Sequence, residues 1–363
     1  MSYFALFAHE RRPLQQCLWI ILLLTILFGT TSVVAQPTWQ VRSPAAFGLS
    51  GARLAEVFDR ADDLAPLNSL LIARGDSLVA AQTFGGMTLD RPTNVKSASK
   101  NILSALTGLA FADSALTQLQ QPIGPFFPAV LPDTSRKADI TLYHLLTMQV
   151  GLESTSFGNY GRWVTSDDWV AHALNRPWVR PPGDGMIYST GTTHILAALL
   201  TKAVDEPLRR YAQRRLFDPL DIEVGSWQQD PDGIYFGGNN LALSPRGLLR
   251  FGQLYLNGGR WNGQQVLPEW WVTASWQPYV TKSYRGFKYG LLWWIEDFGG
   301  VQTYFAWGYG GQFVFIAPEL NLVVAMTSSL STRASGLGDH SGRLFRFWEK
   351  TVLPAVQDTA AVP

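Results

Sequence analysis

Ser97-Ala98-Ser99-Lys100 opens a segment in which Leu103, Leu106 and Ala110 recur at helical spacing. On a helix, a serine and a lysine three residues apart lie on one face, within hydrogen-bonding reach of each other. A serine hydroxyl is a weak nucleophile at neutral pH and needs a base beside it, and a buried lysine with a lowered pKa can be that base. The stretch therefore predicts Ser97 as a nucleophile and Lys100 as its activating neighbour.

The serine–lysine interpretation has alternatives, and the sequence offers some evidence against them. The bland alternative is a helix N-cap serine followed by a solvated lysine. However, no other lysine of the chain has a serine three residues before it, and no Gly-x-Ser-x-Gly elbow occurs. A Ser–His–Asp triad stays open, although none of the five histidines is marked out for one. If Ser97 begins the helix, the N–H groups there also favour a developing negative charge.

Strand patterns flank this segment on both sides and predict the fold class. A first helix with Leu54, Val57, Phe58 and Ala61 on one face precedes two apolar runs separated by Arg74-Gly75-Asp76, which suits a hairpin turn. Residues 100–285 read as helices split by Pro/Gly-rich loops. The later elements are four strands and a closing helix: Tyr289–Trp294, Val301–Ala306, Gln312–Ile316, Leu322–Met326 and Arg343–Leu353.

This order of elements predicts an α+β fold, an antiparallel β-sheet flanked by helices with a helical insertion domain. We expect residues 36–96 and 286–363 to form the sheet lobe. Residues 97–285 then form a mostly helical lobe, with the active site between the two lobes. The length of 363 residues, with 47% hydrophobic and 16% charged, supports a sizeable core.

Composition excludes several function classes. A formal net charge of +1 gives no case for nucleic acid as a partner. Cys17 is the only cysteine and lies in the N-terminal segment, so a thiol nucleophile or disulfide is not expected in the rest of the chain. The histidines show no HExxH spacing, and we expect neither a metal nor a cofactor.

Residues 1–35 have the layout of an export signal. Arg11 and Arg12 precede the apolar run Leu18–Phe28, and the small residues Val33-Val34-Ala35 suit cleavage after Ala35. The alternative is an uncleaved membrane anchor, because the run from Cys17 to Ala35 is nearly long enough to span a bilayer. Either interpretation predicts an exported protein, periplasmic or extracellular, and the second predicts membrane anchoring.

Three segments together resemble the serine β-lactamase and penicillin-binding-protein superfamily. They are Ser97-Ala98-Ser99-Lys100, Tyr188-Ser189-Thr190 and Tyr309-Gly310-Gly311-Gln312, in this order along the chain. The chain is most similar to the class C β-lactamase-related branch, which includes esterases, D-aminopeptidases and 6-aminohexanoate-dimer hydrolases. The resemblance runs from about residue 45 to residue 355.

The resemblance implies a role for each matching residue. Tyr188 would relay the proton between serine, lysine and leaving group, and Thr190 stands where this branch has an asparagine that contacts substrate. Tyr309 stands where relatives carry a lysine or histidine, so the charge that holds the carboxylate of penicillins is missing there. The N–H groups of Ser97 and Gln312 would hold the oxyanion. Gly310 and Gly311 would let substrate approach the strand.

Aromatic and amide residues in the same segments would border the cleft and suit an apolar or flat acyl or amide substrate. We expect this rim to include Gln149, Tyr160, Trp163, Trp294 and Trp307, with Asn239 and Asn240 as loop contacts. The alternative for each is a scaffold role, because the chain has 14 tryptophans.

The sequence as a whole predicts acyl transfer to water through an acyl-enzyme, with a small ester or amide as substrate. One alternative is a β-lactamase or cell-wall peptidase. The other is an inactive homologue that binds cell-wall peptides. The oligomeric state is not predicted.

Overall fold

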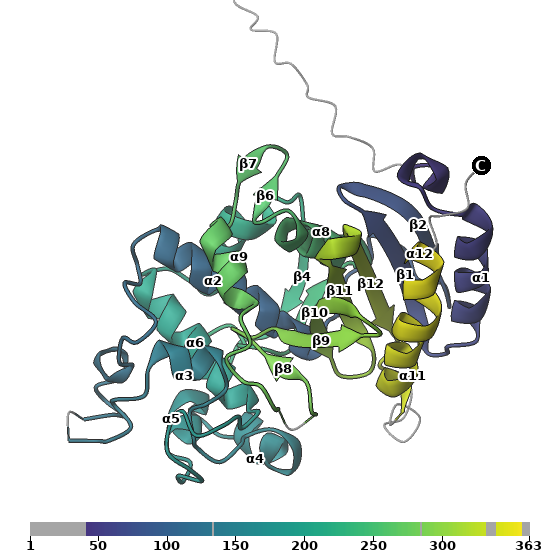
Figure 1. The fold of residues 1–363 in the computed structure, drawn as a ribbon. Coiled ribbons are helices and arrows are strands. Elements are labelled where there is room, and N and C mark those ends of the chain that lie inside the picture. The colour runs from purple at the N-terminus through teal and green to yellow at the C-terminus, as the bar shows by residue number, and fades with distance from the viewer. Residues whose placement is uncertain (1–40, 133, 284, 332–338, 358–363) are drawn as a thin grey trace, which may run out of the picture. The chain divides into compact units, whose positions relative to one another are not determined.

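The central sheet has seven strands, and every neighbouring pair runs antiparallel, in the order β2-β1-β12-β11-β10-β9-β8 (Figure 1). The computed structural model describes residues 41–132, 134–283, 285–331 and 339–357. The strands are β1 (Leu67–Arg74), β2 (Ser77–Thr83), β8 (Lys288–Tyr289), β9 (Trp294–Phe298), β10 (Val301–Gly308), β11 (Gln312–Ala317) and β12 (Leu322–Ser328). The predicted α+β class with an antiparallel sheet is confirmed.

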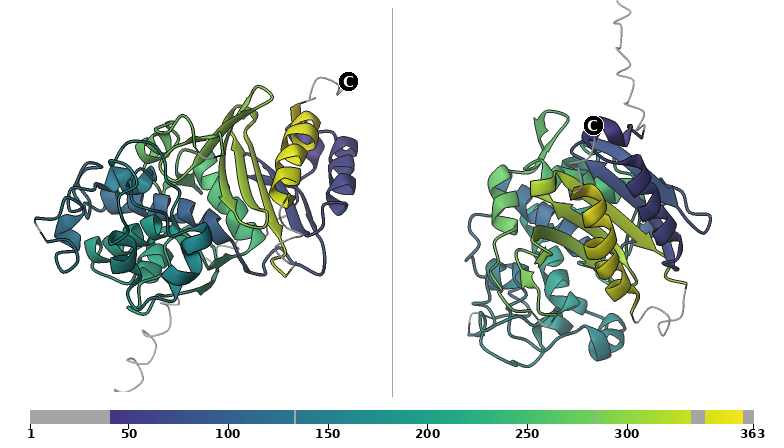
Figure 2. Two further views of the ribbon diagram at one scale, coloured as in Figure 1. Left: turned by 90° about the horizontal axis from the view of Figure 1, so that it is seen from below. Right: turned by 45° about the vertical axis from the view of Figure 1, so that its right-hand side comes forward.

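Burial explains why the inner strands read as continuous apolar runs rather than alternating ones. Every residue of β11 and β12 is buried, because helices cover both faces of the sheet. One face carries α1 (Gly51–Asp62), α11 (His340–Phe347) and α12 (Leu353–Gln357), with a π-helical turn at Trp348–Val352 between the last two (Figure 2). The helix α8 (Pro245–Leu256) packs on β12, β1 and β11.

The helix α2, which follows Ser97 directly, packs against α6 and α9 among the remaining helices. Residues Ser99 to Ala110 of α2 are all buried, so this helix has no solvated face over most of its length. These helices are α2 (Ser99–Ala112), α3 (Leu142–Leu146), α4 (Tyr160–Val164), α5 (Trp169–Leu174), α6 (Thr190–Ala203), α7 (Leu208–Ala212) and α9 (Glu269–Ser275). A π-helical turn, Gln213–Phe217, continues α7.

Two small sheets complete the described structure. The strands β3 (Thr93–Asn94), β5 (Leu241–Leu243) and β4 (Val224–Trp227) form a three-stranded sheet in that order, and β3 directly precedes the segment with Ser97. A two-stranded hairpin joins β6 (Arg260–Trp261) to β7 (Gln264–Gln265).

Several predicted elements differ from those observed. The single strand expected at Tyr289–Trp294 is two strands, because residues 290–293 turn away from the sheet. Leu292 has φ +64°, and its N–H donates to the Leu146 carbonyl at 2.9 Å, outside any ladder. The closing helix starts at His340, three residues before the predicted start. The helix α8 lies in the range expected for the helical lobe but packs on the sheet.

The predicted export segment, residues 1–35, lies outside the described residues, as does Cys17. Within the part of the chain that the structure describes, no helix is both long and apolar enough to cross a bilayer.

Candidate active site

Ser97 lies in a single 3-10 turn, Lys96–Ala98, immediately before α2. The turn is fastened on both sides: the Lys96 N–H donates to Asn94 Oδ1 at 2.9 Å, and the Ser99 hydroxyl donates to the Lys96 carbonyl at 2.7 Å. Lys96 itself has φ +51°, a left-handed conformation that is uncommon for a residue with a side chain. The serine is therefore presented at the N-terminal end of α2, one turn before the regular helix.

Lys100 is the buried partner of Ser97. Its side chain is 2% exposed, and its Nζ lies 3.3 Å from Ser97 Oγ, 3.4 Å from Thr190 Oγ1 and 2.6 Å from the Gly238 carbonyl oxygen. Burial in this apolar surrounding lowers the pKa of Lys100 from 10.5 to about 7. Near neutral pH a large fraction of the amine is unprotonated, which is the form that can accept a proton.

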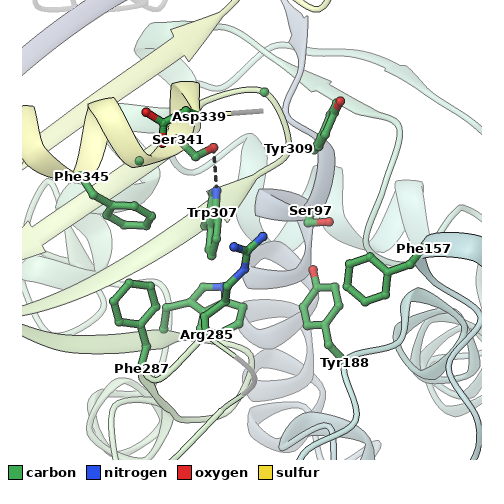
Figure 3. Close-up of a pocket in the computed structure, with 13 residues that line it drawn as sticks. Ser97, Phe157, Tyr188, Arg285, Phe287, Trp307, Tyr309, Asp339, Ser341 and Phe345 are labelled. Carbon is green, nitrogen blue, oxygen red and sulfur yellow. Dashed lines mark hydrogen bonds between the residues drawn. The ribbon is translucent and has the colours of Figure 1, made fainter. Parts of the chain in front are cut away.

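Tyr188 and Thr190 approach the pair from the start of α6. The Tyr188 ring centroid lies 5.1 Å from Lys100 Nζ, and the ring stacks on Trp294 at 6.0 Å. Its hydroxyl points toward Ser97 in Figure 3. Thr190 is buried, and its hydroxyl lies 2.9 Å from Ser156 Oγ in addition to its contact with Lys100. Tyr188 thus faces Ser97, while Thr190 contacts the lysine amine on its buried side.

A buried network positions the carbonyl that Lys100 contacts. The Gly237 N–H donates to His194 Nδ1 at 3.3 Å, and His194 Nε2 lies 2.8 Å from Asp230 Oδ2. Both side chains of this pair are fully buried. Because Nδ1 accepts a hydrogen bond from the Gly237 N–H, Nε2 carries the hydrogen that is donated to Asp230. The Thr193 hydroxyl also donates to the Gly237 carbonyl at 2.9 Å, so residues 237–238 are fixed from two sides.

Ser97 opens into a cavity of about 390 Å³ that is walled mostly by aromatic rings (Figure 3). Its lining comes from six parts of the chain: Ser97, Phe157, Tyr188, Arg285, Phe287, Trp294, Trp307, Tyr309, Gly310, Asp339, Ser341, Gly342 and Phe345. The Trp307 indole N–H donates to Ser341 Oγ at 3.3 Å, which fixes one wall.

The position of Ser97 at a helix start, with a buried lysine one turn on and an antiparallel sheet beside them, agrees with the family comparison. The β-lactamase family model matches residues 64–344, more than half of the chain. The chain belongs to the β-lactamase family. This membership places it among the hydrolases of the β-lactamase fold.

Solved structures with this β-lactamase fold cover most of the chain. EstCE1, a hydrolase with promiscuous acyltransferase activity, has a TM-score of 0.65 at 16% identity over 88% of this chain and 99% of its own. A protein assigned as a 6-aminohexanoate-dimer hydrolase from Bacillus anthracis has a TM-score of 0.64 at 20% identity, covering 82% of each chain. A D-stereospecific amidohydrolase from Streptomyces sp. has a TM-score of 0.61 at 16% identity, over 79% of this chain and 94% of its own.

The structure brings about half of the predicted site residues of this β-lactamase-family chain to the cavity. Ser97, Tyr188, Trp307, Tyr309 and Gly310 all line it. So does Trp294, which the sequence placed on the rim. Lys100 and Thr190 lie behind Ser97 and touch each other rather than the cavity. Their roles in catalysis stay predictions.

Two predicted rim residues are scaffold instead. Trp163 is fully buried against Trp169 and Phe236, and its indole N–H donates to the Trp169 carbonyl at 2.9 Å. The expectation that Trp163 contacts substrate is therefore wrong, because its ring fills the core below α4 and α5. Gln149 is also buried and accepts a hydrogen bond from the Thr147 hydroxyl at 3.4 Å, away from the cavity.

The predicted second oxyanion donor is misplaced as well. Gln312 is fully buried and pairs with Gly308 in the β10–β11 ladder, and its side-chain amide donates to the Ser328 carbonyl at 2.9 Å. Gly311 packs against Ser328 and α11 rather than facing substrate. The ladder ends at the pair Gly308–Gln312, so it is the backbone of Tyr309 and Gly310 that borders the cavity beside Ser97.

The two asparagines predicted as loop contacts bond other residues of the protein instead. The Asn239 side chain donates to the Tyr160 hydroxyl at 2.7 Å, and Asn240 Oδ1 accepts from Asn94 at 2.9 Å. Neither asparagine lines the cavity.

Sequence reasoning missed six lining side chains: Phe157, Arg285, Phe287, Asp339, Ser341 and Phe345. They come from a loop after α3, the segment before β8 and the start of α11, and no local motif marks them. Phe157 stands out only in the structure, where its large apolar side chain is 66% exposed and lines the cavity.

Proposed function

We propose that this chain hydrolyses a small ester or amide through an acyl-enzyme formed on Ser97. One observation carries the proposal. A fully buried lysine amine, with its pKa lowered to about 7, lies 3.3 Å from the hydroxyl of a serine that opens into a cavity. This is the pairing that an activated serine needs, and it has no evident structural purpose, because burying a lysine costs stability.

The neutral amine of Lys100 has two N–H groups and one lone pair. The Gly238 carbonyl and the Thr190 hydroxyl oxygen are both placed to accept its N–H groups. The lone pair is then left for the proton of Ser97 as its oxygen attacks the substrate carbonyl. The new C–O bond gives a tetrahedral oxyanion while Lys100 becomes an ammonium.

Tyr188 completes the proton path in this proposal. Its hydroxyl points toward Ser97 (Figure 3), and its ring lies beside Lys100 Nζ. It passes the proton from the ammonium to the departing alcohol or amine, so that the bond to the leaving group breaks without an unstable anion. Water then attacks the acyl-enzyme along the same path in reverse, returning acid product and free serine.

The oxyanion is held by backbone N–H groups in this proposal. That of Ser97 lies at the N-terminal end of α2, where the helix dipole favours negative charge. The second comes from the Tyr309–Gly310 backbone, which borders the cavity and lies outside the β10–β11 ladder. Donors held in this way need no rearrangement when the charge develops.

Covalent labelling tests the nucleophile. We expect a fluorophosphonate probe to label the wild-type protein and the exposed control Ser226→Ala, whereas Ser97→Ala stays unlabelled. Peptide mapping of the adduct to Ser97 would complete the assignment. Equal labelling of Ser97→Ala and wild type would reject the proposal, and so would an unlabelled wild-type protein.

The substrate class is tested by comparing nitrocefin with p-nitrophenyl acetate. Tyr309 brings no charge to the cavity and its side chain is 55% exposed, so nothing at this position replaces the β-lactam-binding cation of relatives. We expect the acetate ester to be the better substrate by kcat/KM. Faster turnover of nitrocefin would replace the esterase or amidase assignment by that of a β-lactamase.

A further inference from the structure

A chain of hydrogen bonds leads from α11 to the turn between β10 and β11. The Arg343 guanidinium lies 3.3 Å from His340 Nδ1. On the other side of the ring, His340 Nε2 lies 2.9 Å from Ser328 Oγ. The Ser328 hydroxyl in turn donates to the Gly311 carbonyl at 3.0 Å. His340 and Ser328 are both buried, so these bonds are shielded from water.

The chemistry of the groups gives this chain one direction. A guanidinium only donates, so His340 Nδ1 accepts from Arg343. His340 Nε2 then carries the ring hydrogen and donates it to Ser328 Oγ, whose own hydrogen goes to the Gly311 carbonyl. Burial, together with the positive charge of Arg343, lowers the pKa of His340 to about 4. The ring is therefore neutral near pH 7, where Lys100 begins to lose its proton.

The turn Tyr309–Gly311 rests directly on this buried pair. A Cβ at Gly311, which has φ +92°, would lie 2.7 Å from both Ser328 Oγ and His340 Cδ2. Ser328 is itself fixed by Gln312, whose side-chain amide donates to the Ser328 carbonyl at 2.9 Å and accepts from its N–H at 3.3 Å. The outer end of the turn faces solvent, since the Tyr309 side chain is 55% exposed. The turn is thus anchored at its Gly311 end.

The same turn borders the cavity beside Ser97. Tyr309 and Gly310 line the cavity and lie outside the β10–β11 ladder, which ends at the pair Gly308–Gln312. Within the turn, the Gly311 N–H donates to the Gly308 carbonyl at 3.3 Å, which is longer than the bond from Ser328. An oxyanion donor is effective only when it lies about 3 Å from the developing charge. A small displacement of the turn therefore weakens catalysis.

We infer that His340 and Ser328 are positioning residues that hold the Tyr309–Gly311 turn where its backbone N–H reaches the oxyanion. The inference rests on the proposed function for the reaction at Ser97. It adds that α11 controls the second oxyanion donor through a buried histidine. Neither side chain lines the cavity, so the ground-state binding of substrate does not depend on them.

Removing the Ser328 hydroxyl tests the inference. Ser328→Ala should lower kcat for p-nitrophenyl acetate about tenfold with little change in KM, because loss of an entire oxyanion donor costs about 100-fold or more. Ser329→Ala is the matched control, since that hydroxyl bonds Ser331 at the surface, and it should keep the wild-type kcat. A wild-type kcat in Ser328→Ala would overturn the inference.

A tetrahedral inhibitor separates a displaced turn from a loss of folded protein. The boron of phenylboronic acid bonds Ser97 Oγ, and one of its oxygens then takes the place of the oxyanion. We expect the inhibition constant to rise about tenfold in Ser328→Ala, in step with the fall in kcat. A smaller folded fraction would lower kcat and leave the inhibition constant unchanged, and that result would overturn the inference.

Two variants of similar size test the part of His340. The amide nitrogen of His340→Gln can replace the ring Nε2–H as donor to Ser328, whereas the side chain of His340→Met cannot. We expect His340→Gln to keep most of the wild-type kcat and His340→Met to lose activity as Ser328→Ala does. Equal kcat values for the two variants would overturn the assignment to His340.

Hydrogen exchange separates this inference from the proposed function, because it needs no turnover. In the Ser97→Ala background, Ser328→Ala should speed exchange of the Gly311 N–H measured by NMR, whereas Ser329→Ala should not. Faster exchange together with a wild-type protein that lacks esterase and amidase activity would reject the proposed function alone. Unchanged exchange in a protein whose wild type is an active esterase would reject the inference alone.

Discussion

Lys100 Nζ lies closer to the carbonyl oxygen of Gly238, at 2.6 Å, than to the hydroxyl oxygen of Ser97, at 3.3 Å. The shortest contact of the proposed base is therefore with the backbone of a loop far away in sequence. A carbonyl oxygen can accept a hydrogen bond from Lys100 whether the amine is protonated or neutral. The Gly238 carbonyl therefore orients the amine and carries no charge that would offset that of an ammonium. The activity of Ser97 should consequently depend on this loop as well as on Lys100.

The first prediction concerns the pH dependence of hydrolysis. Lys100 acts as a base only when unprotonated, and burial lowers its pKa to about 7. We expect kcat/KM for a neutral ester to be low at pH 5, to rise through a midpoint near 7 and to level off above it. A stopped-flow or initial-rate profile between pH 5 and 9 measures this. A profile that is flat across this range would show that no group of this pKa is required.

The second prediction concerns stability. The pKa of Lys100 is about 7 when folded and returns to about 10.5 when unfolded, so the unfolded chain binds more protons between these values and stability rises with pH in that window. The shift corresponds to about 5 kcal/mol, against about 1–3 kcal/mol for leaving the Gly238 carbonyl unpaired. Lys100→Met should thus be inactive yet melt a few degrees higher at pH 7.

Calorimetry at pH 7 and at pH 10 checks this stability prediction. The gain of Lys100→Met over the wild type should be larger at pH 7 than at pH 10. As the pH approaches 10.5, Lys100 of the unfolded chain binds its proton less favourably, so the folded wild type recovers stability. Lys202→Met, near the end of α6, removes a lysine that is not enclosed and serves as control. A lower melting temperature for Lys100→Met at pH 7 would contradict the prediction.

The third prediction uses two glycines with similar backbone angles. Gly238 has φ +88°, and a Cβ there would meet the Thr193 hydroxyl and would lie 2.7 Å from Lys100 Cγ and 2.9 Å from Lys100 Nζ. Gly263 has φ +79° and open space around it. Gly238→Ala should lower kcat at least tenfold by displacing the lysine, whereas Gly263→Ala carries only the backbone strain. Equal kcat values for the two variants would rule out steric control through Gly238.

The fourth prediction concerns the buried His194–Asp230 pair. In the wild type one carboxylate oxygen of Asp230 bonds His194 and the other accepts from the Ile234 N–H. Asp230→Asn replaces one of these oxygens by an amide nitrogen, so the loop that carries Gly238 should become less firmly held. We expect kcat to fall about tenfold with little change in KM. The pH midpoint should move below that of the wild type, since a protonated Lys100 loses part of its carbonyl contact.

Asp232→Asn, an exposed acid in the same loop, is the control for Asp230→Asn. Melting temperatures identify variants that are merely unfolded, and rates should be compared well below them. A folded Asp230→Asn protein with the wild-type kcat and pH midpoint would show that the pair serves the scaffold alone.

The sequence was most informative where chemistry depends on neighbours along the chain. Ser97 and Lys100 are three residues apart, so helix geometry alone brings them together, and the structure does place Nζ 3.3 Å from Oγ. The hairpin β1–β2 was predictable for the same reason, since a glycine-containing turn joins two apolar runs. Local spacing therefore sufficed for the nucleophile pair and for most strands.

Residue spacing could not show whether a large side chain lies in the core or at the cavity wall. Trp163 and Trp307 read alike, as aromatic residues near a cleft, yet one fills the core and the other walls the cavity. Likewise, nothing near Arg285 in the sequence shows that it lines the same cavity as Ser97. The prediction for Gln312 failed because the sequence does not show where the β10–β11 ladder ends. The ladder ends at the pair Gly308–Gln312, and this end decides which backbone groups face the cavity.

The strand order has a consequence for how the enzyme comes into being. β1 pairs with β12, and Gly308 at the end of β10 packs closely on the Val95 carbonyl beside the nucleophile turn. On a ribosome, the segment with Ser97 and Lys100 emerges long before the strands that wall it. A nascent or prematurely terminated chain thus carries its reactive serine without the groups that would make it a hydrolase. The proposed hydrolysis therefore requires β10 and α11, which line the cavity together with Ser97, to be synthesised and packed first.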